Sequence, residues 1–423
     1  MVPTSKTIEE LTETLIDYRG KTPRKISSGI VLITAKVIKD GFVIDTNQEY
    51  IADDDYDQWM RRGLPKQWDI LLTTEAPLGE VAQIRTTEPV ALAQRVILLR
   101  GNPHLIDQSY YFQALKSPLV QAQFKARSTG TTVLGIKQSE LRKVQVPLFS
   151  LPTQKKIAAV LSAYDDLIEK NVRRIKILEK MAQLIYEEWF VKFRFPGHEK
   201  VRMVKSELGS APKEWAVKKV TDALWVNPRV SVPKEGQKPF VPMSSLYDNS
   251  MLIGETEIRT GNSGSKFQNG DTLFARITPC LENGKTGFVQ FLPSPEAVAV
   301  GSTEFIVLRS RNLCPEYVYL LARSDPFRDN AIKSMSGASG RQRVQEKCFD
   351  KFLIAQPDAV TLEGFSSVVS PMFTSIHLLA RKNSNLRCTR DLLLPNLISG
   401  EIDVETLDIK VPAENGAAVA ASV

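Results

Sequence analysis

A chain of 423 residues is too long for a single hydrophobic core and predicts two or three domains. Its 43% hydrophobic and 24% charged residues are typical of a folded globular protein and exclude a disordered one. The sequence has no apolar run near the ~18 residues of a membrane span, and its charged start is unlike a signal peptide. The net charge of +7 is compatible with binding a polyanion but does not establish it.

The first 150 residues predict a mixed α/β domain that ends in a strand. In this strand Val144, Val146 and Leu148 alternate with polar or bent positions, which is the period of a half-buried strand. From about Leu151 the apolar period becomes that of a helix, and it continues to Phe190. Because an isolated helix takes most of its stability from packing an apolar face, this helix needs a partner elsewhere in the chain.

The second half of the chain repeats the first. Similar segments occur in the same order at a nearly constant separation: 8–23 with 217–232, 67–74 with 269–276, 95–101 with 304–310, 116–130 with 323–337, and 144–149 with 352–357. One weak match would mean nothing, but an ordered series implies a duplication. We therefore expect two mixed α/β domains, each followed by a long helix.

The two long helices carry matching apolar seams with 3–4 spacing, as in a coiled coil. The first seam contains Leu161, Tyr164, Ile168, Asn171, Ile175, Leu178, Ala182, Ile185 and Trp189. The second contains Phe365, Val369, Met372, Ile376, Leu379, Asn383, Leu386, Arg390 and Leu393. The alternative is two amphipathic helices that each pack on their own domain.

An antiparallel pairing matches these seams residue by residue and sets Asn171 opposite Asn383. A single polar residue in an apolar seam is a common way to fix the register of a coiled coil. The sequence thus predicts a pseudo-two-fold molecule, in which an antiparallel two-helix coiled coil separates two duplicated globular domains. Such a shape suits two separated half-sites on DNA.

Two polar, basic and glycine-rich loops precede the helices at equivalent places, and we consider them candidate DNA contacts. Hydroxyl groups, backbone amides and the side chains of Arg and Gln form hydrogen bonds with phosphates and base edges. A solvated loop can have the same composition. The first loop, 125–138, offers Lys125, Arg127, Ser128, Thr129, Thr131 and Lys137. The second, 333–345, offers Ser336, Ser339, Arg341, Gln342 and Arg343. Weaker candidates of the same kind are Arg61, Arg62, Lys66, Lys266 and Arg276.

No catalytic motif is complete. The two GKT triplets lack the glycine of a phosphate-binding loop, because Leu15 and Pro279 stand at its place. The segment 227–230, NPRV, lacks the second proline and the aromatic residue of an amino-methyltransferase site, and Asp358 with Glu363 lacks the lysine of a metal nuclease. The four scattered cysteines and three histidines have no zinc-ligand spacing and predict reduced thiols. We therefore expect neither a catalytic centre nor a metal site.

Several phrases of the sequence resemble the DNA-specificity subunit of type I restriction–modification systems. VPLFSLPTQKKIAAVL and YEEWFVKFRFPG are similar to the central conserved region of that family, and RDLLLPNLISGEIDV is similar to its distal conserved region. IDYRGKTP and ELGSAPKEWAVKKVTDALWVNPR are similar to the openings of its two target-recognition domains. The resemblance covers about residues 5–405.

The resemblance implies a domain organisation: target-recognition domains at 1–150 and 196–358, helices at 151–195 and 359–404, and a disordered tail at 405–423. Each domain would read one half of a bipartite site on double-stranded DNA. The helices would set the gap and carry two modification subunits, which restriction subunits join.

The same resemblance implies that this chain binds no cofactor itself. S-adenosylmethionine, ATP and magnesium would lie on the partner subunits of a cytoplasmic prokaryotic complex. Two alternatives remain open from the residues, a coiled-coil scaffold with two protein-binding lobes and a specificity module of another DNA-modifying system. The missing motifs argue against a fused methyltransferase or a nuclease.

Overall fold

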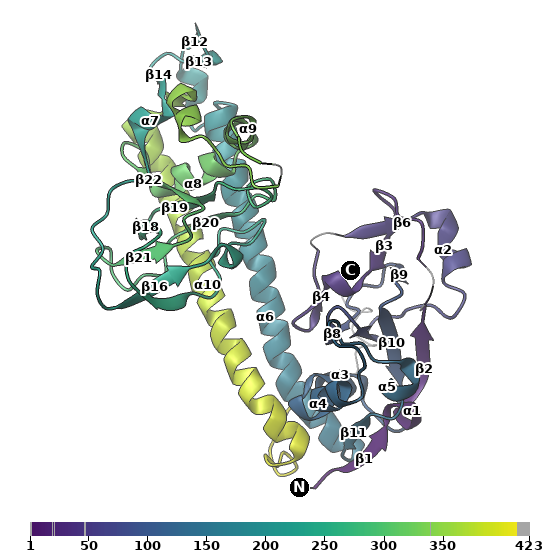
Figure 1. Cartoon of the computed structure of the whole chain (residues 1–423). Coiled ribbons are helices and arrows are strands. Elements are labelled where there is room, and N and C mark those ends of the chain that lie inside the picture. Colours follow the sequence, from purple (N-terminus) through teal and green to yellow (C-terminus); the bar gives the residue numbers. More distant parts are fainter. Residues whose placement is uncertain (1, 19, 21, 46–47, 339, 413–423) are drawn as a thin grey trace. The chain divides into compact units, whose positions relative to one another are not determined.

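The computed structural model describes residues 2–18, 20, 22–45, 48–338 and 340–412. The chain forms two compact units, which we call unit 1 (Met1–Glu169 with Ser384–Val423) and unit 2 (Lys170–Asn383). The helices α6 (Leu151–Tyr186) and α10 (Ala359–Ser399) each contribute to both units (Figure 1). In the described part of the chain, no helix combines the length and the apolar character needed to cross a membrane.

Unit 1 is built on a four-stranded antiparallel sheet in the order β2-β10-β7-β8, beside a smaller sheet in the order β6-β3-β9. Ahead of α6 its elements are β1 (Thr4–Thr7), α1 (Ile8–Leu11), β2 (Thr12–Asp17), β3 (Ile30–Ile33), a 3-10 turn (Ala35–Val37), β4 (Ile38–Lys39), β5 (Phe42–Val43), β6 (Glu49–Ile51), α2 (Asp53–Trp59), β7 (Ile70–Thr74), β8 (Leu78–Gln83), β9 (Val90–Leu92), β10 (Val96–Gly101), α3 (Gln108–Lys116), α4 (Pro118–Ala126), α5 (Gln138–Leu141) and β11 (Gln145–Leu148).

Unit 2 repeats this plan with a four-stranded antiparallel sheet in the order β15-β22-β19-β20 and a second sheet in the order β17-β16-β21-β18. After α6 its elements are a π-helical turn (Glu187–Val191), a 3-10 turn (His198–Lys200), β12 (Met203–Ser206), β13 (Gly209–Pro212), β14 (Ala216–Lys219), α7 (Val220–Ala223), β15 (Leu224–Val226), β16 (Gln237–Val241), a 3-10 turn (Met243–Ser245), β17 (Glu257–Thr260), β18 (Ser265–Gln268), β19 (Thr272–Ala275), β20 (Thr286–Phe288), β21 (Val298–Gly301), β22 (Phe305–Ser310), α8 (Pro315–Arg323), α9 (Asp325–Lys333), a 3-10 segment (Glu346–Lys351) and β23 (Leu353–Gln356).

The identical strand order of the two four-stranded sheets confirms the duplication. In both units a short strand pairs antiparallel with the strand before the long helix, β1 with β11 and β14 with β23. The structure corrects one sequence match by three residues. Ile8 begins α1 and Val220 begins α7, so Ile8 corresponds to Val220 and not to Val217.

A buried ion pair recurs at the same place in each main sheet. Asp69, just before β7, accepts two hydrogen bonds from Arg100 at 2.7 and 2.6 Å. Asp271, just before β19, accepts two from Arg309, both at 2.6 Å. Each carboxylate also accepts a backbone N–H three residues upstream, at 2.7 Å in both units. The two-pronged geometry satisfies both buried carboxylates and joins neighbouring strands of each main sheet, β7 to β10 and β19 to β22.

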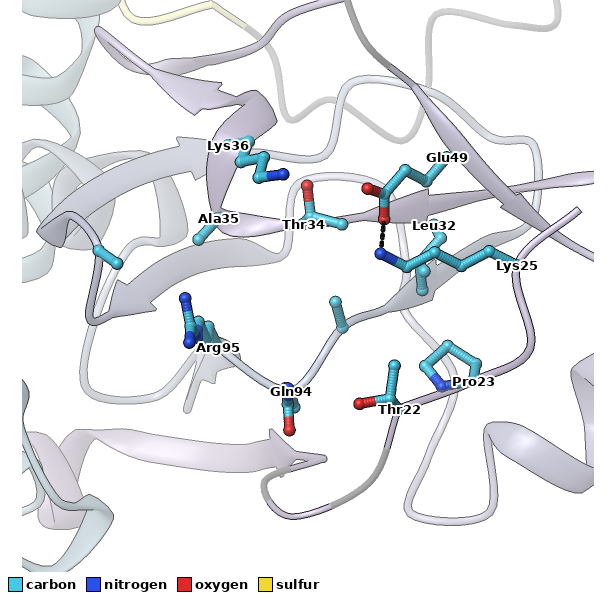
Figure 2. A pocket seen from close by; sticks show the side chains of 12 residues that line it. Thr22, Pro23, Lys25, Leu32, Thr34, Ala35, Lys36, Glu49, Gln94 and Arg95 are labelled. Atoms are coloured by element: carbon cyan, nitrogen blue, oxygen red, sulfur yellow. Dashed lines mark ion pairs between the residues drawn. The ribbon is translucent and has the colours of Figure 1, made fainter. Parts of the chain in front are cut away.

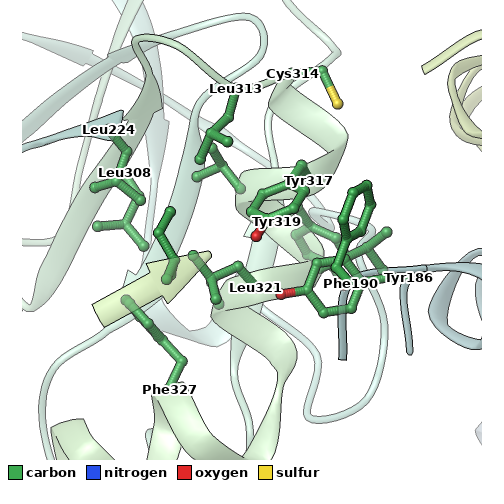
Figure 3. Packing of buried hydrophobic residues seen from close by; sticks show 14 of the residues in the cluster. Tyr186, Phe190, Leu224, Leu308, Leu313, Cys314, Tyr317, Tyr319, Leu321 and Phe327 are labelled. Carbon is green, nitrogen blue, oxygen red and sulfur yellow. The ribbon is translucent and has the colours of Figure 1, made fainter. Parts of the chain in front are cut away.

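The core of unit 2 joins α6 and the π-helical turn after it to α8 and α10 through edge-to-face contacts of aromatic side chains. Figure 3 shows Tyr186 and Phe190 against Tyr317 of α8, with ring centroids 5.2 and 4.7 Å from that of Tyr317. Phe190 also lies 4.8 Å from Phe365 of α10, in an edge-to-face arrangement. These contacts bury the apolar face that the sequence assigns to each helix.

Within unit 2 the two long helices pack antiparallel in the predicted register. Asn171 donates from Nδ2 to Oδ1 of Asn383 at 2.8 Å, and both side chains are buried. Further along, the ring centroids of Trp189 and Phe365 lie 5.9 Å apart. The hydrogen bond confirms the expected Asn–Asn pair.

Within unit 1 the helices also run antiparallel, but the polar contact there is an ion pair. Asp165 of α6 accepts from Arg390 of α10 at 2.6 Å, and both side chains are buried. The predicted seam assigned position 164, and not 165, to the interface. The remaining predicted seam residues are all buried or partly buried. The buried ones are Leu161, Ile168, Ile175, Ala182, Phe365, Val369 and Ile376, and the partly buried ones are Tyr164, Leu178, Ile185, Trp189, Met372, Leu379, Leu386 and Leu393.

The expected disordered tail, 405–423, begins too early, because residues 405–409 pack on unit 1. Lys156 of α6 donates to the carbonyls of Val404, Glu405 and Leu407 at 2.8 to 3.3 Å. Ile409 packs on the apolar core of unit 1. These residues therefore belong to unit 1, and the end of the expected tail, 413–423, lies outside the described residues.

Candidate nucleic-acid interface

The two candidate loops lie at equivalent corners of the two units. Each corner is formed by the end of the third strand of the main sheet, the residue before β10 or β22, and the loop after α4 or α9. In unit 1 the N–H of Thr74 donates to Arg95 at 3.0 Å, and the carbonyl of Thr74 accepts from Ile136 at 3.0 Å. In unit 2 Arg276 makes the same two backbone bonds, with Glu304 at 3.0 Å and Val344 at 2.8 Å.

The first loop folds back on itself as a small hairpin. The backbones of Thr129 and Gly135 exchange two hydrogen bonds of 2.9 Å. Gly130 has φ +114°, and a Cβ there would lie 2.2 Å from the carbonyl oxygen of Val133, so glycine is required. The hairpin holds its tip, including Thr131, exposed to solvent.

Two adjoining hollows surround the corner of unit 1. The first, of about 340 Å³, is lined by Thr74, Glu75, Gln94, Arg95, Thr129, Val133, Gly135, Ile136 and Lys137. The second, of about 230 Å³, shares Gln94 and Arg95 with it. Figure 2 shows the second hollow with Lys36 and Arg95 toward one end and a Lys25–Glu49 ion pair of 2.5 Å toward the other. The charged side chains that line the two hollows are thus four cations and two carboxylates, and Lys36 and Lys137 are the cations not paired with a lining carboxylate.

The corner of unit 2 holds a wider hollow of about 530 Å³ with three cationic side chains, Arg229, Lys266 and Arg276. The structure therefore brings together two predicted residues, Lys266 and Arg276, that are distant from the loop in sequence. Gly264 at its edge has φ +108°, and a Cβ there would lie 2.0 Å from the carbonyl oxygen of Gly301. Only glycine lets this segment approach β21 so closely.

Carboxylates hold several of the predicted arginines. Arg343 donates from Nε and Nη2 to Glu304 at 2.6 to 3.0 Å, and this hydrogen bonding lowers the pKa of Glu304. Arg276 pairs with Glu346 at 3.0 Å. Arg127 pairs with Glu140 at 3.3 Å, and Glu140 also binds Lys143 at 2.7 Å. The guanidinium groups are thus held in place before any ligand binds.

Other candidates make local contacts that shape the loops. Ser128 donates to the carbonyl of Lys125 at 2.7 Å, and Ser336 accepts from Gln345 at 2.7 Å. Gln342 bonds through its backbone with Thr278, at 3.0 and 3.1 Å. Arg341 is exposed, as are Lys125, Thr129 and Lys137, whereas Ser339 lies outside the described residues.

The weaker candidates of unit 1 contribute to its framework. Arg62 donates from Nη1 to the backbone carbonyl of Asp17, and its backbone N–H donates to the hydroxyl oxygen of Tyr18 at 3.0 Å. The N–H of Lys66 binds Asp69. The side chains of Arg61, Arg62 and Lys66 are exposed, but none of them lines the hollows of the corner.

The sequence did not single out Arg95, Glu304, Gln94 or Arg229. A usable signal existed for the first two, because both open a pair of matched segments, 95–101 and 304–310. A polar residue immediately before a repeated buried strand lies at the sheet edge in both copies. Arg229 belongs to the NPRV segment, whose pattern gives no signal for a DNA contact. Among the described residues there is no group of three or more potential metal ligands.

Comparison with known proteins gives consistent similarities. Residues 61–180 match the family described as "Type I restriction modification DNA specificity domain". The chain is 28% identical to the type I restriction enzyme MjaIX specificity subunit of Methanocaldococcus jannaschii, over 80% of this chain and 78% of that protein. It is 24% identical to the MjaVIII specificity subunit of the same organism, over 89% and 87% of the two chains.

The fold resembles a solved structure as well. The type I restriction–modification system S subunit from M. genitalium aligns with a TM-score of 0.53 at 16% identity. The alignment covers 94% of this chain and 99% of that one. At this level of identity the match supports the fold, with both units and both long helices included.

Proposed function

The chain belongs to the family of DNA-specificity subunits of type I restriction–modification systems, and we propose that each of its two units reads one half of a bipartite DNA site. The observation that carries this proposal is the pair of equivalent corners. Each corner presents cations around a hollow on the same backbone framework, but with different side chains. A common framework with different side chains suits two half-sites of different sequence.

The chemistry of the corners matches double-stranded DNA. Exposed cations such as Lys137 and Arg341, and the partly exposed Lys266, suit phosphate contacts, which set register and affinity. Guanidinium groups held by a carboxylate suit base edges, because their direction is set in advance. Both long helices belong to both units, so we expect helix length to set the number of base pairs between the half-sites.

We further propose that the chain acts through partners in the cytoplasm and binds no cofactor itself. Two modification subunits would carry S-adenosylmethionine and methylate adenine, and restriction subunits would add ATP-driven translocation and cleavage with magnesium. A stripe on α6 supports a docking role for the helices. Ile177, Met181 and Leu184, at helical spacing, are 52%, 43% and 44% exposed.

The two-reader proposal is tested by transplanting residues 1–150 into a relative whose bipartite site is known. The methylated adenines in the host genome are then mapped. One half-site should change, while the other half and the spacer stay the same. If both halves change together, or if the spacer changes, the proposal is wrong.

The competing scaffold function is tested by direct binding. A reader that contacts several phosphates should lose affinity for its duplex steeply as salt rises, because bound counterions are released on binding. A protein-binding scaffold should show no preferred duplex at any salt concentration.

A further inference from the structure

Three backbone positions at each corner correspond one to one between the units. They are 75 and 277 after the third strand, 95 and 304 before β10 and β22, and 135 and 343 in the loops. Bridges join Glu75 to Gly135 and Ile277 to Arg343, and these two loop residues also bridge to Thr129 and Ser336. The backbone frame of this triplet is therefore the same in both units.

The side chains on that frame are different. Unit 1 carries Glu75, Arg95 and Gly135, and Nε of Arg95 lies 2.9 Å from the Glu75 carboxylate. Unit 2 carries Ile277, Glu304 and Arg343, and Arg343 reaches the Glu304 carboxylate at 2.6 Å. Each triplet thus contains one arginine–glutamate pair, but the arginine has moved from the sheet edge to the loop.

We propose that Arg95 and Arg343 each read a guanine in their half-sites, with Glu75 and Glu304 as positioning residues. This inference rests on the proposed function and names the residues that make the two half-sites different. Because the arginine occupies a different position of the triplet in each unit, it should reach a guanine at a different position of each half-site.

The geometry of Arg343 favours a base edge as its ligand. Its Nε and one Nη2 hydrogen face Glu304, so the outer Nη1–Nη2 edge of the fork points away from the carboxylate. That edge presents two parallel donors, which match O6 and N7 of guanine in the major groove. The arginine side chains are half exposed, at 50% for Arg95 and 47% for Arg343.

The charge of the pair argues against a phosphate contact. An arginine bound to a carboxylate is neutral as a unit, so it adds little to the attraction of the DNA backbone. Arg341, two residues before Arg343, is the opposite case. It is exposed, and its side chain has no ion-pair partner among the described residues, so it suits a phosphate.

The test compares Arg343→Gln, Arg343→Lys and Arg95→Gln with the control Arg341→Gln. Each full-length variant is expressed with the modification subunits, and genomic methylation is mapped. Binding of the complexes is then measured on duplexes that carry each base change of the mapped site. Arg343→Gln should relax one guanine position of one half-site by about 5- to 150-fold. Arg95→Gln should do the same in the other half-site.

Arg343→Lys separates recognition from folding. It keeps the charge and the partner of Glu304 but lacks the fork, so it should lose the guanine preference while its melting temperature and salt dependence stay near wild type. Arg341→Gln should weaken binding to all sequences alike and reduce the salt slope by about 1.

Two outcomes overturn the assignment. If the Arg343 variants keep the wild-type preference at every position, or flatten all positions equally, Arg343 reads no base. A failure of the proposed function looks different, because wild type itself would then methylate no bipartite sequence.

Discussion

At the scale of single residues, the most consequential side chain outside the corners is Asp165. It accepts from Gln113 at 2.7 Å, from Lys116 at 3.2 Å and from Arg390 at 2.6 Å, so it ties α3, α6 and α10 together within unit 1. Its side chain is only 2% exposed. A buried carboxylate with two cationic partners is tolerated because each charge has a partner.

We expect Asp165→Ala to destabilise unit 1 by roughly 3–5 kcal/mol, because it removes the carboxylate partner of buried Lys116 and leaves buried Arg390 with only the exposed carboxylate of Asp391. The free energy of unfolding in urea measures this. Asp166 is the matched control, since its side chain is 49% exposed and pairs with Arg85 at 2.9 Å. Asp166→Asn should cost less than about 1 kcal/mol. Equal costs for the two variants would contradict this account of the network.

The same residue predicts a pH dependence. Burial acts to raise the pKa of Asp165, but Lys116 and Arg390 outweigh it and hold the pKa below its usual value. A carboxyl group with a depressed folded-state pKa stabilises the fold fully above its unfolded pKa of ~3.9. This contribution is lost as the pH falls through the folded-state pKa.

The stability difference between wild type and Asp165→Asn should therefore be constant near neutral pH and shrink below about pH 4. Urea unfolding over a series of acidic buffers checks it. A difference that grows on acidification would mean that the sign of the pKa shift is wrong.

At the scale of elements, the register of the two long helices within unit 2 is specified by a polar contact in an apolar seam. Asn171 and Asn383 satisfy each other in a buried layer of unit 2. The neighbouring layers are apolar, with Ile175 and Ile376 buried. A register shifted by one turn would set each Asn against an apolar side chain and leave its amide unsatisfied.

Replacing Asn171 by Leu should remove the donor that Asn171 supplies to the buried Oδ1 of Asn383 and cost roughly 1–3 kcal/mol. Replacing both by Leu should be tolerated better, at the expense of a unique register. Urea unfolding gives the cost, and cross-linking of cysteine pairs along the seam reports the register. Arg174→Leu, at an exposed position of the same helix, is the control and should change little. A double variant less stable than either single variant would contradict the pairing.

At the scale of the whole molecule, the proposed division of labour predicts an inert chain. The purified protein should transfer no methyl group from S-adenosylmethionine to DNA, because the sequence lacks a complete methyltransferase motif. Incorporation of a radioactive methyl group into genomic DNA measures this. Adding the modification subunits should restore methylation at one bipartite sequence. Methyl transfer by the chain alone would refute the assignment.

A variant of the α6 stripe tests where those subunits dock. Ile177→Glu with Leu184→Glu places charges on an exposed apolar face, so the fold should persist while co-purification of the modification subunits is lost. Exposed Arg173, changed to Glu, is the matched control on the same helix. Equal retention of the subunits by both variants would place docking elsewhere.

The sequence by itself determined the duplication, the two long helices and the register of their Asn pair. These features are readable because they rest on local periodicity and on repeated order, which need no knowledge of the fold. The family phrases belong to the same class, since they are contiguous in the chain. The one match between the two halves that the structure corrects, Ile8 with Val220 in place of Val217, is shifted by only three residues.

Only the tertiary structure decided which charges meet. Arg95 pairs with Glu75 at the sheet edge, and Arg343 of the loop pairs with Glu304 beside β22. Asp165 of α6 pairs with Arg390 of α10. Such pairs join residues far apart in sequence, and strand pairing and helix packing set their geometry. The composition of the two loops predicts cationic side chains at both corners. Which of them are held by a carboxylate, and which stay exposed, depends on neighbours that only the folded chain supplies.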